Sequence, residues 1–421
     1  MQPTAEITQG TGSSTVVTNC QVCGSADLAS ALFLGFLPPV NKMQDIGQRP
    51  HAQPSYPAEL LVCGHCSLVQ SGVIVDRDVL FPADYSYKSG TTKSLRQNFA
   101  ELYEECRDLL RLTADDLIVD IGSNDGTLLR NFKDGGHRIL GVEPTNVADL
   151  AITAGIPTVK CFLSGDAAET IRAEHGRARL VTATNSFAHI DDIHVAMEAI
   201  MSLLADDGVF VSETRYLARI LETNQFDSVY HEHLRHYSLT SICHLLKMSG
   251  LEVFHAKRIP THAGSIRVYA ARQGAMRPMD SVAGILTEER AAGDLAIQLS
   301  AFRDTTAASK RGLLKIMTEI RDSGQRIVGI SAPSRASTLV NYVGIDEEMM
   351  DCVLEISGSM KIGKYLPGTI IPVLEEKILF DEQPDFALLL AWHVGDDLAA
   401  KLRAAGYKGQ FIIPLPEPRI I

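Results

Sequence analysis

The fourteen residues from Phe226 to Leu239, FDSVYHEHLRHYSL, gather side chains that move protons or bind metals. These side chains belong to Tyr230, His231, Glu232, His233, His236 and Tyr237. An imidazole with a pKa near neutral serves as a base, and phenols or imidazoles donate hydrogen bonds to a developing oxyanion. The stretch therefore suits removal of a proton from a carbon beside a ketone.

The spacing inside this stretch supports that interpretation. Tyr230 and His233 are three positions apart and would share one face of a helical turn, with Glu232 placed to orient an imidazole. Two other interpretations stay open from the cluster alone. One is a second metal site, although H-E-x-x-H spacing and a neighbouring cysteine pair are absent. The other is an exposed amphipathic segment.

A candidate cofactor loop begins the central part of the chain. DLIVDIG at 116–122, followed by SNDGTLLRNF, predicts a strand, a glycine turn and a helix. A dinucleotide needs several glycines beside its pyrophosphate, but this loop keeps only Gly122 and Gly126. Glu143 follows Gly122 by 21 residues, at the end of the next predicted strand, where a carboxylate accepts both ribose hydroxyls. An ordinary buried turn is the alternative, and NAD binding is a weaker one.

The loop and the acidic residue together resemble S-adenosylmethionine-dependent methyltransferases. The resemblance implies that Asp120 and Gly122 pass beside the methionine part of the cofactor. It also implies that Asp125 faces the ammonium and that Glu143 holds the ribose. The expected cofactor-binding residues are Asp120, Gly122, Asn124, Asp125, Glu143 and Asn185. Methyl transfer to carbon needs a carbanion, which forms as an enolate when the C–H lies beside a ketone.

Four of the eight cysteines form two C-x-x-C pairs, Cys20, Cys23, Cys63 and Cys66. The short spacing lets both thiolates of a pair bind one ion, and four sulfurs suit tetrahedral Zn²⁺. A thioredoxin-type pair would follow a strand and open a helix, which neither pair does. With no open coordination position, this zinc would be structural. Two unrelated redox or structural pairs are the alternative, and His65 could replace one ligand.

Alternating segments predict the fold. HRILGVEP, ARLVTATNS, DGVFVSET and SIRVYAARQ, separated by helical stretches, indicate a parallel, doubly wound sheet. After a helical region at about 280–324, the strand, turn and helix order recurs in QRIVGISAPSRASTLVNY, DCVLEIS and DFALLLAW. The expected fold class is α/β, with a small zinc-binding N-terminal module, a central Rossmann-like class I methyltransferase domain and a C-terminal Rossmann-like α/β domain.

Composition and boundaries complete this division. We expect a disordered tail at 1–18, the zinc-binding module at 19–80 and the methyltransferase domain at 81–280. A helical connection and the C-terminal domain then occupy 281–421. A formal charge of −12 and a pI near 5.6 argue against nucleic acid as a partner. Because no signal peptide or membrane-spanning stretch is found, we expect a cytoplasmic protein without a membrane partner.

Over about residues 19–415 the chain is similar to the sugar C-methyltransferase family. The motifs that carry the resemblance, in unchanged order, are the cysteine pairs, VDIGSNDGTLL, NSFAHI, FDSVYHEHLRHYSL, HAGSIRVY, and GISAPSRASTLVNY with KIGKYLPGTIIPV. These enzymes methylate nucleotide-linked 4-keto-6-deoxy sugars, usually at C3. The resemblance implies a three-part enzyme whose substrate lies in the cleft between the parts.

Catalytic roles follow from the same resemblance. His233, in the Y-x-E-H motif, removes the C3 proton, while Tyr230 lies near the sugar ketone or ring with Glu232 beside it as an orienting group. Three further residues are expected at the active site: His189, Tyr85 and Tyr87. A 4-ketone makes the adjacent C3 proton acidic, which agrees with a histidine base.

The C-terminal motifs depart from the family pattern. G-x-x-A-P usually continues with lysine and glycine, whereas this chain has Ser334, Arg335 and Ala336, and Arg335 could act as a forked donor to the diphosphate. The W-N pair is Trp392-His393 here. The expected substrate-binding residues are His262, Arg267, Ser334, Arg335 and Lys361. HAGSIRVY could equally be a strand entry, and KIGKYLPG a solvated basic turn.

These observations favour a nucleotide-sugar C-methyltransferase that uses S-adenosylmethionine and a structural zinc. Two alternatives remain: an NAD-dependent sugar oxidoreductase or epimerase, and a non-catalytic zinc-dependent interaction protein. The sequence leaves the oligomeric state open and is compatible with a monomer.

Overall fold

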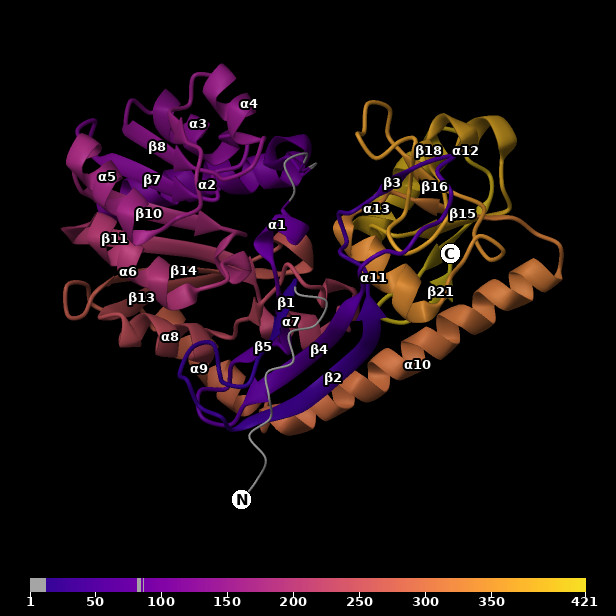
Figure 1. Cartoon of the computed structure of the whole chain (residues 1–421), viewed down its shortest axis with the longest axis horizontal. Helices are drawn as coiled ribbons and strands as arrows, with labels where there is room; N and C mark the ends of the chain where they lie inside the picture. The colour runs from indigo at the N-terminus through magenta and orange to yellow at the C-terminus, as the bar shows by residue number, and fades with distance from the viewer. Residues whose placement is uncertain (1–12, 82–84, 86) are drawn as a thin grey trace.

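The computed structural model of the chain describes residues 13–81, 85 and 87–421. Figure 1 shows two α/β units, one in the middle of the chain and one at its C-terminal end, with N-terminal strands beside both. Most of the tail predicted for residues 1–18 lies outside the described residues. The end of that tail, however, is strand β1 (Ser14–Val16), which pairs with β6 (Val73–Val75), so the tail prediction is wrong there.

The central unit is built on a seven-stranded sheet of order β13-β14-β11-β10-β7-β8-β9. Its strands are β7 (Leu117–Ile121), β8 (Arg138–Val142), β9 (Thr158–Val159), β10 (Ala178–Thr184), β11 (Leu204–Arg215), β13 (Leu251–Ile259) and β14 (Ser265–Arg272). Five neighbouring strands of this sheet, β11, β10, β7, β8 and β9, run parallel to one another. Every residue of β7 is buried, as expected for a strand covered on both faces.

This sheet is mixed, and the prediction of a parallel sheet is wrong at one end. Strand β14 pairs antiparallel with both β11 and β13. Only residues 260–264 separate β13 from β14, which is too short for the crossover that a parallel pair requires.

Helices pack on both faces of the central sheet. Ile118 of β7 lies in one core cluster with residues of α2 and α3, whereas its neighbour Val119 lies in another with residues of α5 and α6. The helices of this unit are α2 (Lys93–Leu110), α3 (Thr127–Asp134), α4 (Ala148–Thr153), α5 (Gly165–His175), α6 (Ile193–Leu203), α7 (Leu217–Glu222), α8 (Leu239–Met248) and α9 (Asp280–Ala291).

The C-terminal unit has a six-stranded sheet of order β18-β16-β15-β19-β20-β21. Its strands are β15 (Ile327–Ile330), β16 (Val353–Glu355), β18 (Val373–Glu375), β19 (Phe386–Leu389), β20 (Gln410–Ile413) and β21 (Arg419–Ile420). All run parallel except β21. Its helices are α11 (Ser334–Val343), α12 (Lys377–Glu382) and α13 (Gly395–Ala404). This arrangement confirms the predicted second Rossmann-like domain.

The N-terminal strands join the two units. β2 (Leu28–Leu37), β4 (Tyr56–Cys63) and β5 (Val69–Ser71) form a sheet whose fourth strand is β12 (Arg235–His236), from the histidine-rich stretch. The short strand β3 (Gln44–Asp45) pairs instead with β17 (Lys364–Tyr365) of the C-terminal unit. The short helix α1 (Arg77–Leu80) follows β6.

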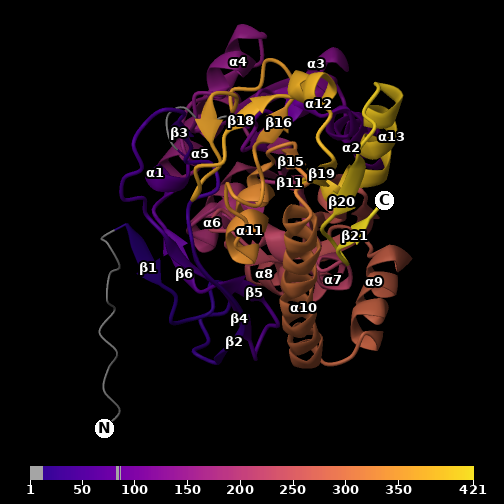
Figure 2. The ribbon, with the colours of Figure 1, turned by 90° about the vertical axis from the view of Figure 1, so that its right-hand side faces the viewer.

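A long helix, α10 (Leu295–Asp322), crosses from the N-terminal sheet to the C-terminal unit (Figures 1 and 2). Its buried positions recur every three or four residues, so one stripe of the helix faces the core. Phe302 and Met317 share a core cluster with Leu32 of β2 and Ile330 of β15. Among the described residues, no helix combines the length and apolar character needed to cross a bilayer, and the cytoplasmic location stays a prediction.

Candidate active site

The histidine-rich stretch is fixed by contacts on both sides of His233. A one-turn 3-10 helix (Phe226–Ser228) opens the stretch, and the amide of His233 then donates to the carbonyl of Tyr230 at 2.9 Å. The amide of Leu234 donates to the carbonyl of Ala188 in the central unit at 3.0 Å. Strand β12 follows at once and pairs with β5. The central unit and the N-terminal sheet therefore hold the turn between them.

One hydrogen bond determines the chemical state of His233. Nδ1 lies 2.6 Å from the carbonyl oxygen of Ser228, which is only an acceptor, so Nδ1 carries the hydrogen. Nε2 has no hydrogen-bond partner in the described part of the chain. Burial, followed by the positive charge of Arg215, holds the pKa of His233 well below its usual value. The ring is therefore neutral, with the Nε2 lone pair free to accept a proton.

Neutral aromatic side chains surround this ring. Tyr230 packs against it with ring centroids 3.9 Å apart, and His189 meets it edge-on at 5.0 Å. Burial raises the pKa of the Tyr230 phenol, which keeps its proton to donate. Burial and then Arg215 lower the pKa of His189 to about 4. The sequence prediction that these three residues lie together is consistent with this geometry.

Glu232 has a different neighbour from the one expected. Its Oε1 accepts a hydrogen bond from Nδ2 of Asn41 at 2.6 Å, whereas the carbonyl of Ser228 orients the imidazole of His233. The role of orienting the histidine is thus assigned wrongly to Glu232. Burial raises the pKa of Glu232 to about 7. Burial, followed by the charge of Glu232, raises the pKa of Tyr85 well above its usual value.

The other histidines of the stretch do not share the arrangement of His233. Nε2 of His231 lies 3.2 Å from the carbonyl oxygen of Tyr56 and 3.3 Å from that of Pro57, so this ring attaches the stretch to β4. His236 lies in β12, with its ring 6.1 Å from that of His233.

The predicted cofactor residues lie where β7, β8 and β10 end. Asn124 and Asn185 both have left-handed backbone conformations, with φ of 52° and 57°, which asparagine tolerates better than most residues. Gly122 has φ 70°, and a Cβ atom at this position would lie 2.5 Å from Cβ of Ser186. Only glycine therefore fits the turn at position 122. This turn lies at the carboxyl edge of the sheet, which is the usual ligand position in a doubly wound fold.

The acidic residues of this edge are already hydrogen-bonded within the protein. Glu143 accepts from the amides of Asn124 at 3.0 Å and Thr145 at 2.9 Å. Asp120 accepts from Oγ1 of Thr182 at 2.6 Å, and burial raises its pKa to about 7. Oε1 of Glu143 also accepts from Oγ1 of Thr145 at 2.6 Å, so the remaining lone pair is on Oε2. This oxygen and the carboxyl group of Asp120 can still accept from a ligand.

Asn124 and Asp125 also hold a neighbouring segment. Oδ1 of Asn124 accepts from the amide of Ser89 and Oδ2 of Asp125 from that of Gly90, both at 2.8 Å. Nδ2 of Asn124 donates to the carbonyl of Tyr87 at 3.2 Å, and burial raises the pKa of the Tyr87 phenol to about 12. The segment that carries Tyr87 therefore lies against the cofactor loop. A contact between Asp125 and the cofactor ammonium stays a prediction.

The residues of this edge fit S-adenosylmethionine. The turn at Gly122 lets a ligand approach the backbone closely, and the hydroxyl of Ser123 is buried without a hydrogen-bond partner among the described residues. Glu143 follows β8 directly, where the ribose of a nucleoside is expected.

Arg335, predicted to contact a diphosphate, is tied to the histidine-rich stretch instead. Its Nη2 donates to Oδ1 of Asp227 at 2.7 Å and to Oε1 of Gln225 at 3.1 Å, and its guanidinium lies 5.0 Å from the ring of Trp392. Nε and Nη1 of Arg335 are buried without partners in the described part of the chain. These two donors remain for a ligand, and the diphosphate contact stays a prediction.

Ser334 and Lys361, two predicted substrate-binding residues, make hydrogen bonds within the protein. Oγ of Ser334 donates to Oδ1 of Asn41 at 3.0 Å, so Asn41 bridges Ser334 and Glu232. Nζ of Lys361 donates to the carbonyl of Ala332, and burial lowers the pKa of this amine. The N-terminal module thus contributes a residue between two predicted site residues.

HAGSIRVY divides into two parts with different environments. His262 has φ 54°, and its Nε2 is buried without a partner among the described residues. Burial, followed by the charge of Arg215, lowers the pKa of His262 to about 3. Arg267 is fully buried in β14, where Nε donates to Glu213 at 2.5 Å and Nη2 to Oδ1 of Asn98 at 2.9 Å. The substrate-binding role predicted for Arg267 is therefore wrong, because carboxylates and an amide within the protein occupy its guanidinium.

The four predicted zinc ligands converge. The sulfurs of Cys20 and Cys66 are 3.5 Å apart, as are those of Cys23 and Cys63, and all four lie within 4.8 Å of one another. Zinc–sulfur bonds of about 2.3 Å in a tetrahedron place sulfurs at roughly this separation. Four cysteines leave no open coordination position, so the residues fit a structural Zn²⁺.

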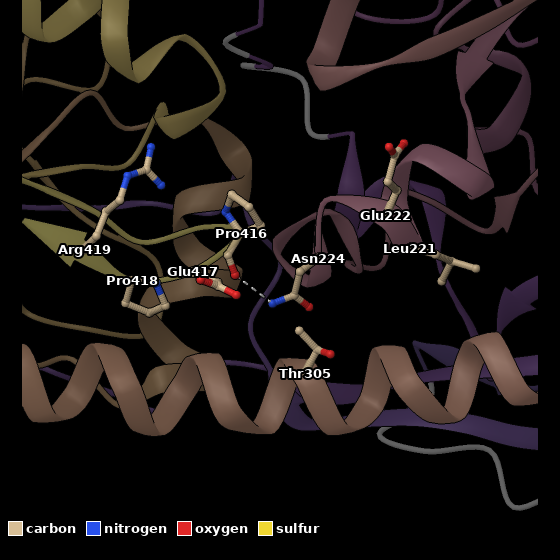
Figure 3. A pocket seen from close by; sticks show the side chains of 8 residues that line it. All are labelled: Leu221, Glu222, Asn224, Thr305, Pro416, Glu417, Pro418 and Arg419. Atoms are coloured by element: carbon tan, nitrogen blue, oxygen red, sulfur yellow. Dashed lines mark hydrogen bonds between the residues drawn. The ribbon is translucent and has the colours of Figure 1, made fainter.

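Two cavities lie away from His233. One of about 380 Å³ opens between α7, α10 and the C-terminal segment, where Asn224 donates to the carbonyl of Pro416 at 3.4 Å (Figure 3). The other, of about 620 Å³, is lined by residues of α7, the loop before β14 and the side chains of Trp392 and His393. Neither is lined by a predicted catalytic residue.

Sequence reasoning missed several residues of the site. Ser228 contributes only its carbonyl, which any residue type supplies, so no sequence signal marks it. Asn41 is 191 positions from its partner Glu232, so no local pattern connects the two residues. Asp227 lies inside the quoted motif, and a carboxylate there could have suggested a partner for Arg335. Arg215 directly follows the predicted strand DGVFVSET and is the last residue of β11, where a ligand-facing cation is a reasonable expectation.

The fold and the site define a class I S-adenosylmethionine-dependent methyltransferase with a zinc-binding N-terminal module. Three family descriptions match: a zinc binding domain at residues 20–81, a methyltransferase domain at 94–256, and a C-methyltransferase C-terminal domain at 260–416. The C-methyltransferase NovU of Streptomyces niveus is 33% identical, over 96% of this chain and 97% of its own length. The chain belongs to this C-methyltransferase family. A non-catalytic protein and an NAD-dependent enzyme are both set aside by this membership.

Two solved methyltransferases each match less than half of the chain. One from Anabaena variabilis is 14% identical over 42% of this chain and 86% of that one, with a TM-score of 0.34. The magnesium protoporphyrin IX methyltransferase of Synechocystis, solved with bound S-adenosylmethionine, is 14% identical over 43% of this chain and 83% of its own, with a TM-score of 0.32. The family assignment rests on the sequence relative.

Proposed function

We propose that this C-methyltransferase methylates C3 of a nucleotide-linked 4-keto-6-deoxy sugar, with His233 as the base that forms an enolate. The observation that carries the proposal is the 2.6 Å contact between Nδ1 of His233 and the carbonyl of Ser228. It leaves Nε2 as the basic atom, and the rings of Tyr230 and His189 lie next to the imidazole. A base of this kind is needed for methylation at carbon, whereas a hydroxyl or amine acceptor needs only modest deprotonation.

The proposed roles follow from the geometry. Nε2 of His233 removes the proton next to the ketone, and the phenol of Tyr230 and the imidazole of His189 are the nearest ring neighbours that can donate to the oxygen. Burial limits the access of water to this base, since His233 is only 6% exposed. S-adenosylmethionine, when bound, supplies the methyl group as an electrophile activated by the sulfonium.

The substrate class rests on the resemblance of the motifs and on cationic donors in the C-terminal unit. Nε and Nη1 of Arg335 remain without partners, in the described residues, beside the histidine-rich stretch. A forked guanidinium of this kind binds phosphate oxygens well.

The test is an incubation of the zinc-loaded protein with S-adenosylmethionine and a panel of 4-keto-6-deoxy nucleotide sugars in deuterated water. Product mass and hydrogen exchange at each ring carbon are followed. A gain of one methyl at C3 of one sugar, with exchange at C3 when S-adenosylmethionine is omitted, supports the proposal. Methylation at oxygen, or at a carbon that is not next to the ketone, contradicts it. A matched panel of 4-hydroxy sugars is the control and should neither exchange nor react.

A further inference from the structure

Arg215 is a partly buried cation for which the described residues provide no counter-ion. It is the last residue of β11, at the carboxyl edge of the central sheet, opposite Ser265 of β14. Its side chain forms no hydrogen bond or ion pair with the described residues, and Nη1 is buried. A guanidinium stays protonated in proteins, and burying such a charge without a partner is costly. An anion that binds beside Arg215 would remove this cost.

Asp227, whose charge acts on Arg215, does not fulfil this role, because its oxygens are used elsewhere. Asp227 accepts from Nη2 of Arg335 on Oδ1 and from Nε1 of Trp392 on Oδ2, each at 2.7 Å. Burial lowers the pKa of Arg215, and the charge of Arg335 adds to this effect. The two arginines therefore differ: Arg335 forms an ion pair with Asp227, whereas Arg215 forms none with the described residues.

The neutral rings around the base are affected by Arg215. The charge of Arg215 is the second cause, after burial, of the low pKa values of His189, His233 and His236. Arg215 is also the first cause after burial that acts on the phenol of Tyr230. The chain directly after Arg215 also pairs with the histidine-rich stretch, because Tyr216 bridges Tyr237 and the amide of Leu217 donates to the carbonyl of Tyr237 at 2.9 Å. Arg215 thus enters the site beside this stretch, where an anion forms during the proposed reaction.

We propose that the guanidinium of Arg215 binds and stabilises the enolate oxygen that forms when His233 removes the proton from the acceptor carbon. This inference rests on the proposed function. In the step, the C–H bond breaks and the proton forms a bond to Nε2 of His233. The electron pair of the C–H bond forms the carbon–carbon double bond, and the π pair of the ketone moves onto oxygen. Two ions of opposite charge arise, His233 as a cation and the oxygen as an anion, and Arg215 compensates the second.

The test compares Arg215→Met, Arg215→Lys and a matched control, Arg219→Met, in the zinc-loaded protein. Arg219 is exposed and pairs with Glu222, so its loss should leave exchange unchanged. Hydrogen exchange at the acceptor carbon is measured at saturating nucleotide sugar without S-adenosylmethionine. Loss of one preorganised oxyanion contact typically costs about 100- to 1,000-fold in rate. Arg215→Met should lose this much exchange, and Arg215→Lys should lose less.

A second measurement separates the enolate from a phosphate. Binding of nucleoside diphosphates without sugar is measured by calorimetry for wild type and Arg215→Met. We expect dissociation constants within about threefold of one another, since the proposed contact is with the sugar oxygen. Diphosphate binding weakened tenfold or more, with exchange at saturation retained, would show that Arg215 holds the diphosphate and would overturn the inference.

The folding of the variant and the proposed function are tested separately. Removal of a partly buried cation that has no partner among the described residues should leave Tm unchanged or raise it, so Arg215→Met is expected to fold. A lowered Tm that Arg215→Lys restores, without a change in exchange, would assign Arg215 a structural role and contradict the inference. If wild type exchanges no proton on any 4-keto sugar, the proposed function fails. If wild type exchanges and Arg215→Met exchanges equally fast, only the role of Arg215 fails.

Discussion

Nδ1 of His233 lies 2.6 Å from the carbonyl oxygen of Ser228, five residues earlier in the same stretch. A backbone carbonyl cannot change its protonation, so this contact fixes one tautomer of the ring and directs the Nε2 lone pair away from the turn. The stretch is held in this shape because it passes directly into β12 of the N-terminal sheet.

The first prediction concerns His233→Gln. The variant should lose at least about 100-fold in both hydrogen exchange and methyl transfer, since a general base typically contributes 10²- to 10⁴-fold. Its affinity for S-adenosylmethionine, measured by calorimetry, should be unchanged. His231→Gln is the contrast: it removes contacts to Tyr56 and Pro57, so Tm should fall while exchange by the folded protein persists. Exchange retained in His233→Gln would assign the base elsewhere.

The second prediction concerns Tyr230→Phe. This change keeps the ring that packs on His233 at 3.9 Å and removes only the hydroxyl. If the phenol donates to the enolate oxygen, the exchange rate at saturating substrate should fall roughly 10- to 100-fold with little change in Tm. Tyr237→Phe is a control, because the buried ring of Tyr237 stacks on that of Phe187, whereas the ring on His233 is that of Tyr230. Equal rates for wild type and Tyr230→Phe would restrict Tyr230 to packing.

The third prediction is a pH dependence of stability from Glu232. Burial raises its pKa from 4.5 to about 7, so the folded state binds this proton more tightly than the unfolded state. The stability gained from the bound proton is complete below pH 4.5 and is lost as pH rises through about 7. Glu232→Gln keeps an acceptor for Asn41 and cannot ionise.

The measurement is Tm of wild type and Glu232→Gln between pH 5 and 8. The variant should be similar to wild type near pH 5 and more stable at pH 8, by up to roughly 3 kcal/mol. A difference in Tm that is constant with pH would show that Glu232 ionises normally.

The fourth prediction concerns zinc. Metal analysis of the purified protein should find about one Zn²⁺ per chain, and Cys23→Ser should lose it. β5 of the N-terminal module pairs with β12, which follows His233 in the chain. Loss of zinc should therefore also lower the rate of hydrogen exchange at the acceptor carbon of the substrate. Cys161→Ser, outside the cluster, is the control and should keep the metal. Full activity of a zinc-free protein would contradict a structural role for the metal.

The fifth prediction tests the correction at Arg267. Arg267→Met leaves Glu213 buried without its cation and should cost about 3–5 kcal/mol of unfolding free energy, measured by denaturant titration. The double variant Arg267→Met with Glu213→Gln should recover part of this loss. The KM of the folded variant for the nucleotide sugar should not change. A raised KM without loss of stability would restore the substrate-binding role.

The comparison of sequence and structure shows which signals are local. Local sequence patterns predict three features of the cofactor site: the strand LIVDI, the turn at Gly122 and the acidic residue after the next strand. The structure contains all three as predicted. The antiparallel pairing of β14 was missed because β13 was not recognised and strand direction depends on connection length. Arg267 was assigned to substrate because a positive charge in a motif does not reveal which carboxylates surround it.

The sequence by itself determined the zinc ligands, the cofactor turn and the concentration of proton-transferring side chains around His233, since spacing along the chain is enough for each. Tertiary structure decided which of those side chains meet. It placed Asn41 on Glu232, Arg335 on Asp227 and left Arg215 without a counter-ion among the described residues. These contacts join residues far apart in the chain, and their partners depend on strand order and on packing across three parts of the molecule, which no linear pattern specifies.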